Sequence, residues 1–97
     1  MDIAQFRSSV AAEEPPGGLS GPLLALWYDA KGEWDHAHQI LQDEPGEDGS
    51  WVHAYLHRVE GDESNAGHWY RKAGRPHSQA PLTDEWETIA GALLATS

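Results

Sequence analysis

The feature that most constrains the fold of this 97-residue chain is an internal repeat of small residues, rings and glycines. The first copy consists of Ala25, Tyr28, Gly32, Ala37 and Leu41, and the second, with identical spacing, of Ala54, His57, Gly61, Ala66 and Tyr70. Small residues let two helices approach closely, a glycine between them permits a tight turn, and bulky residues fill the remaining groove. The repeat therefore predicts two consecutive helical hairpins.

Glycine and proline clusters divide the rest of the chain, and the apolar spacing between them is helical. We expect an N-terminal helix and linker over residues 1–18, a first hairpin over 20–43, a second over 50–74 and a last helix over 83–95. Ser50 and Thr83 are the expected N-caps of the third and last helices. Strand patterns are close to absent, so the sequence predicts one all-α domain over residues 1–97.

The stretch formed by Gly61, Asp62, Ala66, Tyr70 and Ala73 resembles the tetratricopeptide-type helical repeat, as TPR and Sel1-like proteins have it. The repeat offset of 29 residues is shorter than the roughly 34 residues of that family. The resemblance therefore implies shortened hairpins, with the N-terminal and C-terminal helices acting as caps. Residues 20–76 are also similar to a group of short bacterial proteins of unassigned function, a resemblance that implies a fold without supplying an activity.

Charge and composition exclude several classes of function. The chain carries 6 basic and 16 acidic residues, a net charge of −10 that repels nucleic acid and anionic membranes. It has no cysteine, which excludes disulfides and thiolate metal ligands. No apolar run approaches the roughly 20 residues of a membrane span, and the N-terminus lacks the pattern of a secretory signal. We therefore expect a cytoplasmic protein with neither nucleic acid nor membrane as a partner.

Tryptophan is unusually frequent, with five residues in 97. Each indole can bury roughly 150–250 Å² of surface, an efficient way to fill the core of a short chain. We expect most of the five to be buried, and any that remain exposed to mark a contact surface.

The resemblance to TPR hairpins implies a candidate partner-binding surface, because the first helix of each pair lines the concave face in that family. This implies Trp51, Tyr55 and Arg58 as contacts, and the basic residues Arg71 and Arg75 are further candidates. An aromatic anchor with guanidinium groups suits an acidic or C-terminal peptide segment. The alternative is that these arginines only pair with nearby acids.

Histidines form a second candidate site, for a metal ion. His53 and His57 are four residues apart and share one face of a predicted helix. His36, His38 and Glu60 are the candidates for further ligands, since imidazole and carboxylate both bind zinc or iron. The alternative is that His53 and His57 are packing residues bonded to nearby acids or carbonyls.

Three functions follow from these features. The first is a non-catalytic protein-interaction module, and the second is a metal-binding protein or metal-dependent enzyme that uses His53 and His57. The third is self-association, for which the last helix suggests a homodimer. No nucleophile motif or phosphate-binding glycine loop is present, so we expect neither catalysis nor a cofactor in the first case.

Overall fold

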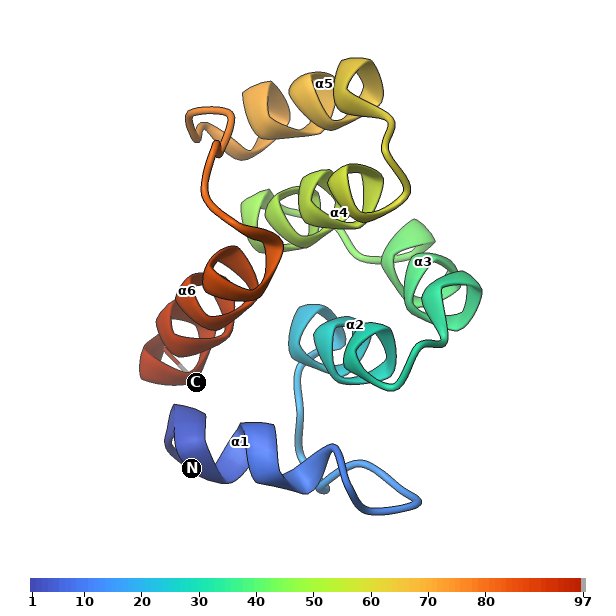
Figure 1. Ribbon diagram of the computed structural model, residues 1–97, viewed down its shortest axis with the longest axis vertical. Helices are drawn as coiled ribbons and strands as arrows, with labels where there is room; N and C mark the ends of the chain where they lie inside the picture. Colours follow the sequence, from blue (N-terminus) through green and yellow to red (C-terminus); the bar gives the residue numbers. More distant parts are fainter. Residues whose placement is uncertain (97) are drawn as a thin grey trace.

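The computed structural model describes residues 1–96, which form six α-helices and no strand (Figure 1). The helices are α1 (Ile3–Ser9), α2 (Gly21–Ala30), α3 (Trp34–Gln42), α4 (Glu47–Val59), α5 (Glu63–Ala73) and α6 (Leu82–Thr96). The all-α prediction is confirmed. Ser97 lies outside the described residues.

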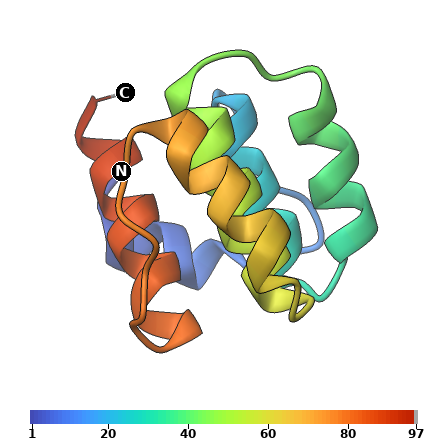
Figure 2. The same ribbon diagram turned by 90° about the horizontal axis from the view of Figure 1, so that it is seen from above.

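The helices pack as two hairpins, α2 with α3 and α4 with α5, followed by α6. Helix α4 is central, because it contacts α2, α3, α5 and α6 (Figures 1 and 2). Every residue of α4 from Gly49 to His57 is buried. A helix that is buried on all sides has no solvent face, so its polar residues must find partners inside the protein.

The two hairpin turns have the same backbone geometry, as the repeat predicts. Gly32 and Gly61 adopt φ angles of 84° and 85°, a left-handed conformation that favours glycine. The amide after each glycine closes the turn in the same way. The N–H of Glu33 donates to the Tyr28 carbonyl at 3.0 Å, and that of Asp62 donates to the His57 carbonyl at 2.9 Å. Gly74 ends α5 with a φ of 69°.

Aromatic residues of α1, α2 and α6 complete the core. The Trp86 indole of α6 donates a hydrogen bond to the Leu26 carbonyl at 3.0 Å, and the ring of Phe6 stacks on it from α1. Trp27, Trp51 and Trp86 are buried, whereas Trp34 and Trp69 are partly buried. The expectation that most tryptophans are buried is confirmed for three of the five.

Two predicted helix boundaries were wrong. Helix α4 begins at Glu47 rather than after Ser50, and its N-cap is Gly46, with a φ of 95°. Glu47 and Asp48 occupy the first turn, where their negative charge favours the positive end of the helix dipole, so Ser50 lies inside the helix. Helix α6 begins at Leu82, one residue before the predicted N-cap Thr83, so Thr83 lies inside the helix.

Across residues 1–96, no helix combines the length and the apolar character that crossing a bilayer requires.

Candidate functional site

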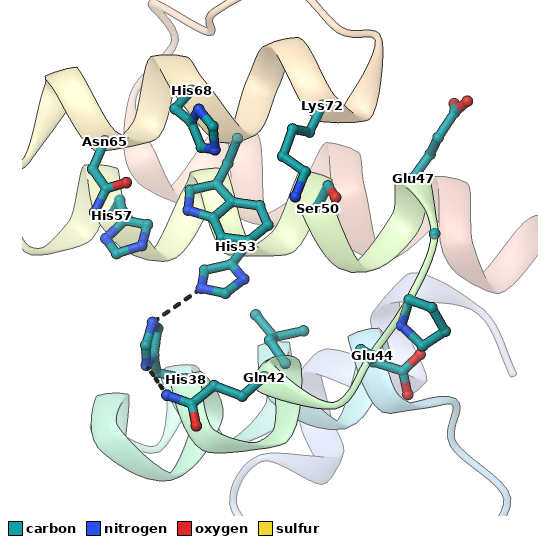
Figure 3. Close-up of a pocket in the computed structure, with 14 residues that line it drawn as sticks. His38, Gln42, Glu44, Glu47, Ser50, His53, His57, Asn65, His68 and Lys72 are labelled. Carbon is teal, nitrogen blue, oxygen red and sulfur yellow. Dashed lines mark hydrogen bonds between the residues drawn. The ribbon is translucent and has the colours of Figure 1, made fainter.

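Three of the predicted metal ligands, His38, His53 and His57, come together at the junction of α3 and α4 (Figure 3). One ring nitrogen from each lies within 4.8 Å of those of the other two. Nε2 of His38 and Nε2 of His53 are 3.0 Å apart and share a hydrogen bond (Figure 3). Two nitrogens bound to one tetrahedral zinc ion, each at about 2.0–2.1 Å, lie about 3.3 Å apart. The cluster is therefore close to the spacing of a metal site.

Both helices position these rings through their local geometry. His53 and His57 are one turn apart on α4, so their rings stack with centroids 5.2 Å apart. The turn between α3 and α4 brings His38 against them from the other side. Its ring meets that of His53 edge-on at a centroid distance of 4.7 Å.

Two tryptophans hold the histidine rings in place. Trp69 of α5 stacks on His53 with centroids 3.8 Å apart and an interplanar angle of 9°. Trp34 stacks on His38 at 4.9 Å, and its own indole N–H donates to the Leu56 carbonyl at 2.8 Å. Stacking of this kind restricts the rotation of both imidazoles.

Hydrogen bonds to the remaining ring nitrogens orient the cluster further. Nδ1 of His57 lies 2.6 Å from a carboxylate oxygen of Glu60, and Nδ1 of His38 lies 3.5 Å from the amide nitrogen of Gln42. A carboxylate that is hydrogen-bonded to one imidazole nitrogen fixes the tautomer, so the other nitrogen keeps the lone pair that can bind a metal. Glu60 thus orients His57, and it also belongs to a more exposed group with His57 and Asp62.

Burial keeps two of these histidines neutral. Desolvation, followed by the neighbouring His38 and His57, lowers the pKa of His53 to about 4. Desolvation and His57 also lower the pKa of His38 from its ordinary value. Neutral imidazole carries the lone pair that binds a metal.

The cluster opens into a pocket of about 820 Å³ between α3, α4 and α5. Its polar lining beyond the histidines comes mainly from α5 and the start of α4 (Figure 3). These residues are Gln42, Glu44, Glu47, Ser50, Asn65, His68 and Lys72. A ligand can therefore reach the histidines from solvent.

His36 does not join the cluster, although the sequence made it a candidate. Its ring stacks on Tyr28 at 3.9 Å, and its Nδ1 lies 4.0 Å from a carboxylate oxygen of Glu33. Two residues correspond to about 200° around a helix, so His36 and His38 point in nearly opposite directions.

The predicted partner contacts Trp51, Tyr55 and Arg58 lie in the interior, where α4 packs against α6 and the segment before it. Trp51 and Tyr55 are 6% and 5% exposed. The Arg58 guanidinium donates to Glu85 at 2.6 Å and to the carbonyl of Ala80 at 2.9 Å. Helix α6 and the segment before it thus cover most of these side chains, although Tyr55 and Trp51 each line a surface pocket.

The other two predicted anion contacts, Arg71 and Arg75, are exposed. Arg75 lies over the ring of Trp51, with its guanidinium carbon 3.6 Å from the ring centroid. Arg71 is exposed on α5. Peptide binding by these residues stays a prediction.

Tyr55 takes part in a different polar contact, with Asp29 of α2. Its hydroxyl hydrogen-bonds the Asp29 carboxylate, and both residues line a second pocket beside Trp86. Desolvation raises the pKa of Asp29 to about 6, and the bond from Tyr55 opposes that shift only in part.

This pKa predicts a pH-dependent gain in stability for Asp29→Asn. Between pH 3.8 and about 6 the folded chain holds a proton that the unfolded chain has released, so stability falls as the pH rises. We expect the variant to be more stable than the wild type by about 1 kcal/mol at pH 7.5, because Asp29 is only partly buried. The two proteins should converge at pH 3.5. Urea unfolding at both pH values measures this, and equal stabilities at pH 7.5 would contradict it.

Trp69 is the site residue that sequence reasoning did not place. The repeat offset aligns His53 with Leu24 and Trp69 with Ile40. Two apolar positions of the first hairpin are thus occupied by rings in the second. Equivalent positions of a repeat have equivalent neighbours. Finding rings at both positions of the second hairpin could therefore have predicted that Trp69 contacts His53.

Comparisons of the chain with protein-family models, with curated proteins and with solved structures find no significant match.

Proposed function

We propose that this protein binds a divalent transition-metal ion, with Zn²⁺ as the reference ion, through His38, His53 and His57. The observation that carries the proposal is the convergence of three imidazole nitrogens within 4.8 Å at the base of an open pocket. Imidazole ligands suit zinc, copper, iron and nickel. The absence of cysteine excludes thiolate ligands from this chain.

Support also comes from the surroundings of the cluster. Trp69 and Trp34 restrict the rings, and Glu60 holds the tautomer of His57. Metal-binding histidines commonly carry such a carboxylate on the second nitrogen. Three protein ligands leave a fourth position of a tetrahedral zinc ion for water or another molecule, an arrangement typical of reactive rather than purely structural sites.

Calorimetric titration of the untagged, chelator-treated protein with Zn²⁺ tests the proposal. We expect one ion per chain for the wild type, and the same for His36→Ala, which removes a histidine outside the cluster. Less than 0.2 equivalents of bound zinc in the wild type would overturn the proposal. So would a loss of binding in His36→Ala as large as the loss in His38→Ala.

We also infer that the two hairpins are a shortened TPR-type pair capped by α1 and α6. The inference is supported by the matching turns at Gly32 and Gly61. Peptide binding in that fold would use Trp51, Tyr55 and Arg58, which α6 and the segment before it cover here. A homodimer through the apolar stripe of α6 would likewise require α6 to leave its own chain. Metal binding requires no such rearrangement, which is why we rank it first.

A further inference from the structure

We propose that the metal site binds a small molecule through an anionic oxygen group, a carboxylate or a phosphate, held between the metal and Lys72. This rests on the proposed metal site and names the class of its ligand. The fourth position of a zinc ion on three histidines is open to such a group. A cation at the same pocket would add a second point of attachment.

Lys72 supplies that cation. It extends from α5 into the pocket, with its Nζ 4.6 Å from the centroid of Trp69, the ring that stacks on His53 (Figure 3). Lys72 and the proposed metal ligand His53 therefore both contact the ring of Trp69. No ion pair of Lys72 occurs among residues 1–96, whereas Arg7 and Arg58 each pair with an acid. An ammonium without a carboxylate partner is available to an external anion.

The acids that line the pocket point away from its histidine end. The carboxylate of Glu44 lies against Gly21 at the start of α2, and that of Glu47 lies towards Gly74 at the end of α5. In Figure 3 the Glu47 side chain extends outward, away from the three histidines. Neither carboxylate points toward the three histidines.

Other polar side chains complete the wall of the pocket. Asn65 and His68 of α5 and Ser50 of α4 line the pocket together with Lys72. Amide and hydroxyl groups donate hydrogen bonds to carboxylate and phosphate oxygens, so they suit the ligand class that the metal and Lys72 select. In a chain of net charge −10, the attraction of an anion to this pocket depends on Lys72 and the metal, because Glu44 and Glu47 are also among its lining residues.

Titration of the Co²⁺-loaded protein with acetate or inorganic phosphate tests the inference, because visible absorption of Co²⁺ responds to a change in its ligands. We expect a saturable spectral change with at least one of the two anions. Lys72→Gln should weaken that anion about five- to tenfold, while its Co²⁺ affinity stays within twofold of the wild type. Arg71→Gln removes an equal charge from an exposed position on the same helix, and should leave anion affinity within twofold.

The outcomes separate this inference from the metal site on which it rests. A protein that binds Co²⁺ but shows no spectral response to either anion overturns the inference and leaves the metal site standing. Equal anion affinity in Lys72→Gln and Arg71→Gln also overturns it. Failure to bind Co²⁺ or Zn²⁺ at all overturns the metal site itself, and the inference with it.

Discussion

Replacing Glu85 by alanine is expected to lower the free energy of unfolding by about 3 kcal/mol, because it removes the buried carboxylate that pairs with the largely buried guanidinium of Arg58. The exposed carboxylate of Glu63, 3.9 Å from the Arg58 Nε, is then the one acid left beside it among the described residues. Glu85 is 4% exposed, and its carboxylate accepts hydrogen bonds from both Arg58 and the Tyr70 hydroxyl. Folded domains are stable by only about 5–15 kcal/mol, so this loss would bring the protein close to unfolding at ambient temperature. Urea denaturation followed by circular dichroism measures it.

Glu87→Ala is the matched control on the same helix. Glu87 pairs with Arg7, but both side chains are about half exposed, and exposed pairs contribute about 0–1 kcal/mol. A loss for Glu85→Ala no larger than that for Glu87→Ala would contradict the account of the buried pair. Replacing Arg58 and Glu85 together by methionine and leucine should recover much of the loss, since no buried charge then remains unpaired.

Replacing His53 by alanine is expected to weaken Zn²⁺ binding at least a hundredfold, or about 3 kcal/mol. Groups that only orient a metal ligand already contribute 10- to 100-fold to metal affinity. His53 is a proposed ligand itself, so its loss should cost at least as much. It is also the central ring, stacked on Trp69 and 3.0 Å from His38. Competition with a chelator of known affinity measures the change.

His38→Ala provides a second variant, which should destabilise the fold less than His53→Ala. His38 lies on a partly exposed position of α3, whereas His53 is buried in the central helix. Both variants should lose zinc while His36→Ala retains it. Zinc affinity unchanged within threefold in either folded variant would contradict the assignment of that ligand.

The hairpins and two of the three proposed metal ligands could be predicted from the sequence, because both depend on local spacing. Gly32 and Gly61 mark the turns, and His53 and His57 share a face by helix geometry alone. The choice of His38 over His36 could not be predicted, since it depends on the angle at which α3 packs against α4. The predicted start of α4 was wrong because Glu47 and Asp48, next to Pro45 and Gly46, have the composition of a loop. Gly46 is instead the N-cap of the helix.

The position of α6 was the other feature that the sequence did not reveal. Trp51, Tyr55 and Arg58 occupy the face of α4 that the resemblance assigns to a partner, and α6 and the segment before it cover that face. The contact depends on Glu85 meeting Arg58 across 27 residues of sequence. In the sequence, nothing distinguishes Glu85 from the other acidic residues, of which the chain has 16 in total. Pairings between distant residues of this kind cannot be inferred from periodicity.

X-ray absorption at the zinc edge of the protein loaded with one equivalent of Zn²⁺ would identify the ligands of the proposed site. We expect a four-coordinate ion with three imidazole nitrogens at about 2.0–2.1 Å and one further light ligand. The same spectrum for His36→Ala, and a loss of imidazole scattering for His53→Ala, would complete the result. A shell of oxygen ligands with at most one imidazole would contradict it.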